Sequence, residues 1–359
     1  MLSLLLVVAA SCTASRPNVP EPEPAPGVVH AAEQPPPPAP DVSGIEPSRQ
    51  GSLSLFFAND LFADNDDGYT AGFGAVWTTG DIADYAERNL IRKCVSLLSF
   101  LPTVGNEGYR NYFQVAFGWE LYTPKDISTP DPPPGSDPYA GVVFLDSTVF
   151  SRSRDAMHAF TLRLGFVGPG AGGREIQTWI HERTGSPVPQ GWDTQLGNEP
   201  LLNLDYGYFR RLLRNTTGRL DYDLEATAAG GFGNYFIGAL GGLQARLGVR
   251  LPHTLGAVPA LGRYDALVGL PSPERRFFLY VFADAQVIVT ARFLPIDGNT
   301  FRASRSGQRD DLTGTVTTGL VVGYGRLLLT WSFTLIGSPV QQSGSRDDFG
   351  TVSLSFHFG

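Results

Sequence analysis

An acidic turn near residue 60 holds the side chains best suited to bind a hard cation. Asn59 and Asp60 precede the turn, residues 64–67 read Asp-Asn-Asp-Asp, and Tyr69-Thr70-Ala71-Gly72 closes it. Carboxylate and amide oxygens packed this densely are ligands that Ca²⁺ accepts. The spacing is not that of an EF-hand loop, so the alternative is a solvated acidic turn between two strands.

A glycine-rich turn followed by a predicted short helix supplies a candidate general base. Gly168-Pro-Gly-Ala-Gly-Gly173 precedes Arg174-Glu-Ile-Gln-Thr-Trp-Ile-His181. Gln177 and His181 lie four residues apart and therefore share one helical face. A histidine there suits general-base catalysis near neutral pH, although a loop histidine is more often incidental. The glycines lack the GxxxxGK[ST] pattern of a phosphate-binding loop.

A third polar cluster, residues 189–200, contains a tryptophan among amides and carboxylates. Trp192 is predicted to mark the membrane interface, where aromatic rings concentrate. Asp193, Gln195 and Glu199 are predicted to structure the loop by hydrogen bonds. The chain shows no GxSxG elbow, zinc-type Cys/His spacing or dinucleotide fingerprint, so the motifs give no support to those chemistries.

The elements that position these clusters are predicted from hydrophobic alternation. In Thr351–Gly359, Val352, Leu354, Phe356 and Phe358 share one face and small polar residues share the other, as a transmembrane barrel strand requires. The pattern predicts twelve strands, at 52–60, 69–80, 110–121, 138–152, 156–168, 199–213, 217–233, 235–249, 276–293, 312–323, 326–338 and 348–358. We therefore predict an all-β fold, a twelve-stranded antiparallel transmembrane β-barrel with a short helix in an outer loop.

Strand parity predicts which loops share a rim. If the first strand runs outward, the connections 61–68, 122–137 and 169–198 all lie on the outer rim, with the three polar clusters. Two long connections, 81–109 and 250–275, then fall on the periplasmic side. Residues 82–101 look helical, and we predict that these connections act as local plugs or caps.

Composition and the N-terminus agree with an exported membrane barrel. Lys and Arg number 27 against 35 Asp and Glu, a net charge of −8 that argues against nucleic acid as a partner. No stretch approaches the roughly 20 apolar residues of a spanning helix. Residues 1–15 are predicted to be a signal peptide, with a lipoprotein signal at Cys12 as an alternative, and residues 16–50 a Pro-rich disordered linker. Residues 51–359 form the predicted barrel domain.

Taken in order, these motifs resemble the lipid A 3-O-deacylase family of LpxR-like barrels. The matching segments are Asn59-Asp60, Tyr69-Thr70-Ala71-Gly72, Leu121-Tyr122-Thr123-Pro124, Asp137-Pro138-Tyr139-Ala140-Gly141, Gly168-Pro169 with Gln177 and His181, and Gly191-Trp192-Asp193-x-Gln195. The resemblance covers roughly residues 51 to 359. It implies an outer-membrane enzyme that removes the 3′-linked acyloxyacyl chain from lipid A, so lipopolysaccharide is the implied substrate and outer-membrane lipids the surroundings.

The resemblance also implies roles for single residues. His181 matches the histidine that activates water, and Ca²⁺ polarises the ester carbonyl. Asn59, Asp60 and Thr70 complete the site, with Asp60 and Thr70 as metal ligands. Gln177 or Asn59 would orient the participants. The site of the family lies between the barrel wall and a loop helix.

One departure keeps other functions open. Some members carry a functional glutamate six residues after the histidine, and this chain has Pro187 there. The alternatives are a non-enzymatic barrel, acting as a narrow channel or a surface-binding scaffold, and a phospholipase-type esterase. The channel ranks lower, because side chains are expected to fill the lumen of so narrow a barrel.

Overall fold

The computed structural model describes residues 40–43, 45, 50–60, 68–82, 100–101, 103–255, 277–337 and 348–359, without the side chains of residues 68–70. The predicted leader and nearly all of the predicted linker lie outside the described residues. So does most of the helix predicted over residues 82–101. The barrel belongs to one compact unit, Ala39–Gly359.

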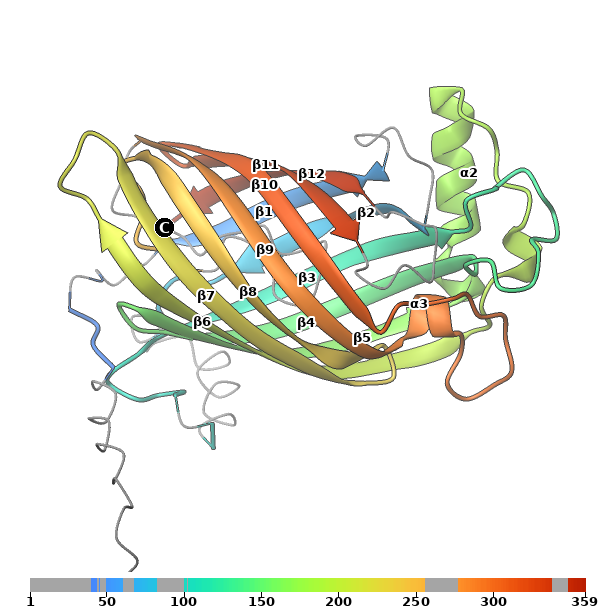
Figure 1. The fold of residues 1–359 in the computed structure, drawn as a ribbon, viewed down its shortest axis with the longest axis horizontal. Helices are drawn as coiled ribbons and strands as arrows, with labels where there is room; N and C mark the ends of the chain where they lie inside the picture. Colours follow the sequence, from blue (N-terminus) through green and yellow to red (C-terminus); the bar gives the residue numbers. More distant parts are fainter. Residues whose placement is uncertain are drawn as a thin grey trace, which may run out of the picture. The chain divides into compact units, whose positions relative to one another are not determined.

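Twelve antiparallel strands form a closed barrel in which β1 pairs with both β2 and β12 (Figure 1). The predicted fold class is confirmed. The strands are β1 Gly51–Asn59, β2 Gly68–Thr78, β3 Arg110–Thr123, β4 Ala140–Arg152, β5 Ala156–Val167, β6 Glu199–Asn215, β7 Asp221–Gly233, β8 Phe236–Val249, β9 Phe277–Phe293, β10 Leu312–Tyr324, β11 Leu327–Gly337 and β12 Phe349–Phe358.

Four short helical segments interrupt the described loops. They are η3 Pro169–Ala171, α2 Gly173–Thr184, η4 Trp192–Thr194 and α3 Leu294–Asp297. In the described part of the chain, every helix is too short or too polar to cross a membrane. All four lie in connections after odd-numbered strands, at the barrel end opposite the C-terminus (Figure 1).

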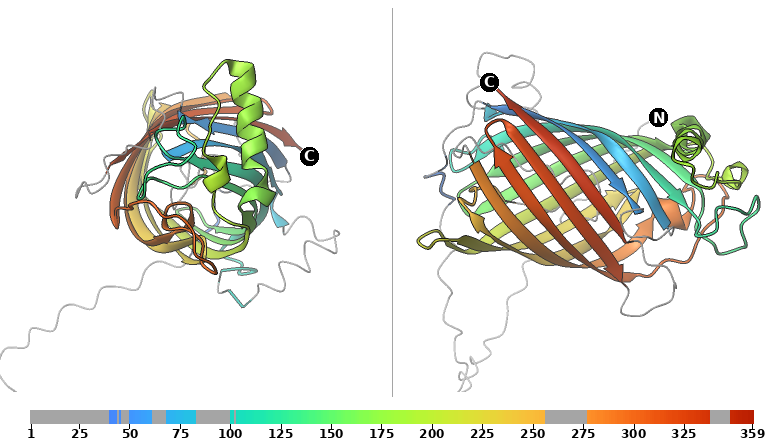
Figure 2. Two further views of the ribbon diagram at one scale, coloured as in Figure 1. Left: turned by 90° about the vertical axis from the view of Figure 1, so that its right-hand side faces the viewer. Right: turned by 90° about the horizontal axis from the view of Figure 1, so that it is seen from above.

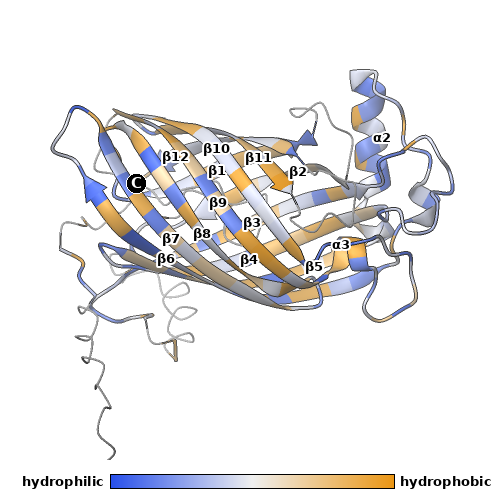
Figure 3. Cartoon of the chain, in the orientation of Figure 1, coloured by the Kyte–Doolittle hydropathy of each residue, from blue (hydrophilic) through white to orange (hydrophobic). Residues whose placement is uncertain are grey.

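Alternation places apolar side chains on the outside of the wall and polar ones in the lumen. In β12, Leu354 and Phe356 are exposed, whereas Ser353, Ser355 and His357 are buried. Strands β9, β10, β11 and β12 all show this alternation of buried and exposed residues (Figure 3). Such an inside-out pattern suits a barrel whose outer wall contacts lipid.

The one boundary that differs by four residues is the start of β7, predicted at 217 and found at Asp221. The side chain of Asn215 accepts hydrogen bonds from the Thr217 backbone N–H and hydroxyl, at 2.9 and 2.8 Å. This Asx turn satisfies backbone and side-chain donors locally and so competes with strand pairing. The connection is longer than alternation alone predicts.

Buried ion networks occupy the lumen, as expected for a narrow barrel. The Arg163 guanidinium donates to both carboxylate oxygens of Asp146 at 2.8 Å and to Glu120 at 3.1 Å. Arg246 pairs in the same bidentate way with Asp223 and also contacts Glu225. Paired charges with satisfied hydrogen bonds can be buried at a tolerable cost.

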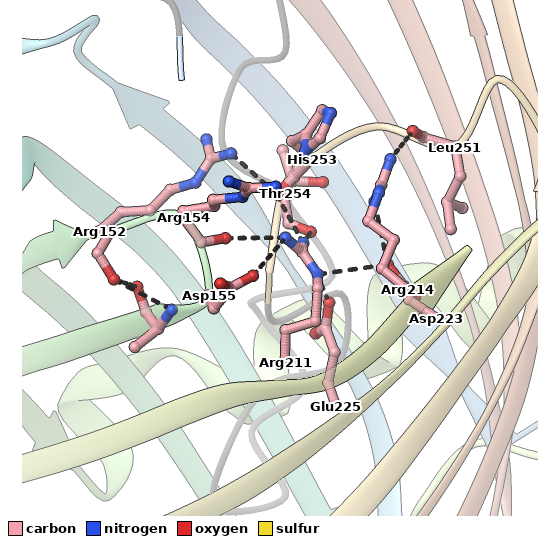
Figure 4. A network of polar contacts seen from close by, with 12 residues as sticks. Arg152, Arg154, Asp155, Arg211, Arg214, Asp223, Glu225, Leu251, His253 and Thr254 are labelled. Carbon is pink, nitrogen blue, oxygen red and sulfur yellow. Dashed lines mark hydrogen bonds and ion pairs between the residues drawn. The ribbon is translucent and has the colours of Figure 1, made fainter. Parts of the chain in front are cut away.

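A short segment, residues 251–255, which we call the plug, packs against lumen-facing side chains at the end opposite α2. Leu251 and Leu255 are buried among inward-facing aromatic side chains. Arginines from the wall donate to the plug's carbonyl groups: Arg152 to His253, Arg211 to His253 and Thr254, and Arg214 to Leu251 and Pro252 (Figure 4). Residues 251–255 lie where a plug is expected, and residues 256–275 of this connection are outside the described residues.

Removing two of these arginines should loosen the plug. We expect the double variant Arg152→Ala and Arg214→Ala to show conductance steps in planar bilayers that the parent lacks, because three donors to residues 251–253 are lost. Arg211 and Arg246 remain to neutralise Asp223. The exposed Arg219→Ala is the control. Unchanged conductance of a correctly folded double variant would show that the lumen is blocked elsewhere.

Candidate functional site

Helix α2 is bounded by two glycines whose backbone conformation other residues rarely adopt. Gly172 at its start and Gly185 at its end have φ of 72° and 75°, in the left-handed region that glycine adopts without strain. The short helix predicted after the glycine-rich turn is therefore confirmed. It carries Gln177 and His181 on one face.

Part of the outer wall beneath this helix is covered. Leu53, Leu55 and Phe57 of β1 are exposed, and Asn59 has the same outward parity, yet Asn59 is only 8% exposed. Strand register aligns Asn59 with Ala71, Ala71 with Leu121 and Leu121 with Gly141. We call these four residues the rim row. All four are buried on a surface that elsewhere faces outward.

Helix α2 and η4 pack over three members of the rim row, Ala71, Leu121 and Gly141. A Cβ atom on Gly141 would lie 3.0 Å from the Cα of Gly173, so strand β4 and the start of α2 touch through their backbones. Ala71, Leu121, Tyr139 and Trp192 form one buried cluster, against which Ile176 packs. The outer wall and the helix therefore share an apolar contact surface.

Trp192 is not at a membrane interface, so that prediction is wrong. Its side chain is buried in this cluster, and its indole N–H donates to Gln177 Oε1 at 2.8 Å. Neighbouring Tyr139 has its ring centroid 5.0 Å from that of Trp192. The apolar partners, contributed by strands distant in sequence, explain why the ring is buried.

Backbone and indole hydrogen bonds fix the rest of the loop to the wall. The Trp119 indole donates to the Ala171 carbonyl at 3.1 Å, and the Gly168 N–H donates to the Gly141 carbonyl at 3.0 Å. Burial raises the pKa of Tyr139 to about 12, so its phenol stays protonated and donates to the Ile127 carbonyl. The predicted structural role of Glu199 agrees with its contacts, because it accepts from the N–H groups of Thr300 and Phe301.

His181 has a defined ring orientation. Its Nδ1 lies 2.6 Å from the carbonyl oxygen of Pro187. Because a carbonyl can only accept, Nδ1 must carry the proton, and Nε2 of the neutral ring is left with its lone pair. The residue that departs from the family pattern thus supplies an orienting acceptor through its backbone.

The stretch of α2 from Gly173 to His181 is nearly as long as the distance across the wall from β4 to β1. At about 1.5 Å per residue, His181 lies about 12 Å along the helix from Gly173. Three strand spacings of about 4.8 Å separate β4 from β1, about 14 Å in all. The helix runs crosswise to the strands at the end where β1 finishes (Figures 1 and 2). The described contacts between α2 and the wall lie in its first turns, at Gly173 on Gly141 and at Ile176 on the buried cluster.

The predicted site residues lie at this same end of the barrel. Asn59 and Asp60 are buried at the end of β1. Thr70 is in β2, at a register shift between Tyr69 and Ala71, and its side chain lies outside the described residues. The side-chain oxygen of Gln177 accepts the hydrogen bond from the Trp192 indole, and this contact anchors helix α2.

The donor chemistry of the described residues fits a hard cation only in part. Asn59 and Asp60 offer an amide and a carboxylate oxygen, both buried and adjacent in the chain. Within the described ranges, no three His, Cys, Asp or Glu side chains gather as a metal site. The acidic residues 64–67 lie outside those ranges. Asn59 and Asp60 are thus the oxygen donors that the described residues offer at the end of β1.

Fold and site together define an outer-membrane barrel that carries a docked helix on its outer wall at one rim. The family model described as outer membrane protein LpxR matches residues 7–358. The chain therefore belongs to the LpxR family of outer membrane proteins.

A solved structure agrees with the fold. LpxR from Salmonella typhimurium aligns with a TM-score of 0.70 at 15% identity, over 86% of this chain and 100% of that one. The β-domain of the Bordetella autotransporter BrkA aligns with a TM-score of 0.42 at 10% identity, over 86% of this chain and 99% of that one. No curated protein matches the chain.

Proposed function

We propose that the protein is a Ca²⁺-dependent lipid A deacylase that hydrolyses the 3′-linked acyloxyacyl ester with water activated by His181. Membership of the LpxR family supports the coarser statement, an outer-membrane lipid A deacylase. The observation that carries the finer proposal is the hydrogen bond between His181 and the Pro187 carbonyl. It leaves one ring nitrogen free to accept a proton, on a helix packed over the rim row.

The proposed chemistry needs no covalent enzyme intermediate. Nε2 of His181 takes a proton from water as the water oxygen attacks the ester carbonyl carbon. The same nitrogen then returns the proton to the departing sugar 3′-oxygen. The products are a free acyloxyacyl acid and a 3′-hydroxyl. The Pro187 carbonyl holds the ring and stabilises the imidazolium form by accepting from Nδ1.

The other residues of the proposed site bind the metal ion and position helix α2. Asn59 and Asp60, with Thr70, would hold Ca²⁺, which when bound supplies a Lewis acid that polarises the ester carbonyl. Gln177 and Trp192 keep α2 on the wall, so the distance between His181 and the rim row is maintained. The site's place on the outer wall suits a substrate embedded in the membrane's outer leaflet.

Purified protein in detergent should release the acyloxyacyl acid from lipid A in the presence of Ca²⁺. Chelation with EDTA should lower the rate about 100-fold, because several kcal/mol of carbonyl polarisation are lost. Excess Ca²⁺ should restore it, and Mg²⁺, which demands a tighter octahedral shell, should not. Mass spectrometry of the lipid gives the readout. An unchanged rate after chelation would contradict the calcium assignment, and loss of a different chain would contradict the 3′ assignment.

A further inference from the structure

Four aromatic side chains form a patch on the outer wall next to the rim row. We call Phe57, Phe73, Phe117 and Trp119 the aromatic shelf. Phe57 and Phe117 are 40% and 44% exposed, and Phe73 and Trp119 are partly exposed. All four have outward parity on β1, β2 and β3. The shelf therefore faces the membrane.

Register places the shelf immediately on the membrane side of the rim row. Phe57 pairs with Phe73, and Phe73 pairs with Trp119. Each lies two residues before or after the rim-row member of its own strand, which corresponds to about 7 Å along the strand. A molecule that has a polar group at the rim row can therefore extend an apolar tail directly over the shelf.

The rings are packed into one surface. Phe73 and Trp119 stack, with centroids 5.4 Å apart, and Phe117 meets Trp119 edge-on at 4.7 Å. Trp119 also donates to the carbonyl of Ala171, directly before α2. A general interfacial belt needs neither ring contacts between two adjacent strands nor a bond to the turn that leads into the helix that carries His181. The shelf is structurally continuous with the candidate site.

We propose that the aromatic shelf binds the acyl chain of the lipid whose ester is cleaved, and that it sets the preferred chain length. This inference rests on the proposed function. The shelf carries no charge, so it suits a hydrocarbon chain better than a phosphorylated headgroup. With the ester carbonyl at the rim row, the chain lies along the strands in the direction of the membrane core.

Photo-crosslinking locates the chain without requiring turnover. A lipid A analogue with a diazirine in its 3′-linked acyl chain is incubated with the His181→Ala variant and irradiated, and the labelled peptides are sequenced. We expect label in β1, β2 and β3, and about tenfold less in the double variant Phe73→Ala and Phe117→Ala. Label spread evenly around the barrel, or concentrated near the exposed Trp331 of β11, would overturn the proposal.

Chain selectivity provides the second measurement. The Phe73→Ala and Phe117→Ala variant keeps the Trp119 bond to Ala171, and we expect its ratio of kcat/KM for long-chain over short-chain esters to fall about tenfold. Trp331→Ala should keep the wild-type ratio. An unchanged ratio in the double variant refutes the shelf while the deacylase proposal stands. If the wild type cleaves no ester, the proposed function fails and the crosslinking decides on the shelf alone.

Discussion

Replacement of His181 by alanine should lower the rate of lipid A deacylation by a factor of about 10² to 10⁴, the usual contribution of a general base. The barrel does not depend on this side chain, because His181 is partly exposed on a helix outside the wall and its recorded side-chain hydrogen bond goes to Pro187. Rates from mass spectrometry, together with heat-modifiable mobility on gels as a test of barrel folding, would separate catalysis from stability.

A second variant distinguishes the base from a purely structural histidine. The amide nitrogen of asparagine occupies nearly the position of Nδ1 and can still donate to the Pro187 carbonyl, but His181→Asn provides no basic ring nitrogen. We expect it to be as inactive as His181→Ala. Near-wild-type activity of His181→Asn would assign the histidine to loop structure. The neighbouring exposed residue, changed as Glu182→Gln, should retain activity.

Alternation and parity predict most of this fold, because each residue of a membrane barrel wall faces either lipid or the lumen. Thr351 to Phe358 show this most clearly, with serines inward and apolar residues outward. The antiparallel order then places the loops after β1, β3 and β5 at one end, as predicted. The boundary at β7 was missed because the turn made by Asn215 is a side-chain effect that alternation does not register.

The docking of α2 on the outer wall has no comparable local signal. Asn59 continues the lipid-facing parity of Leu55 and Phe57, and only tertiary contacts show that its row is covered. Trp192 likewise has the sequence context of an interface residue, yet packs on Tyr139. The glycines Gly141 and Gly173 are the one available hint, since a strand or helix glycine often marks close backbone approach. The contact between these two glycines, which are 32 residues apart, cannot be predicted from one sequence.

The glycine contact beneath α2 should control activity without touching the chemistry. In Gly173→Ala, the new Cβ would meet Trp192 Cη2 at 2.8 Å and the Gly141 Cα at 2.9 Å, so the helix must move away from β4. Displacement of a catalytic group by about 1 Å can cost about 100-fold in rate, and we expect a loss of that order. Alanine favours a helix over glycine by about 1 kcal/mol, so unwinding of α2 would not explain the loss.

The matched control is Gly337→Ala at the end of β11, where an added Cβ meets no atom of the described residues within 4 Å. It should leave both the rate and the barrel intact. In a variant that keeps Trp192 and has the other four tryptophans replaced by phenylalanine, the fluorescence reports the displacement, because the indole loses its packing against Gly173 while barrel mobility on gels stays that of the parent. Full activity of Gly173→Ala with an altered Trp192 signal would mean that the reaction tolerates a displaced helix, and the proposed role of the docked helix in positioning His181 would then have to be abandoned.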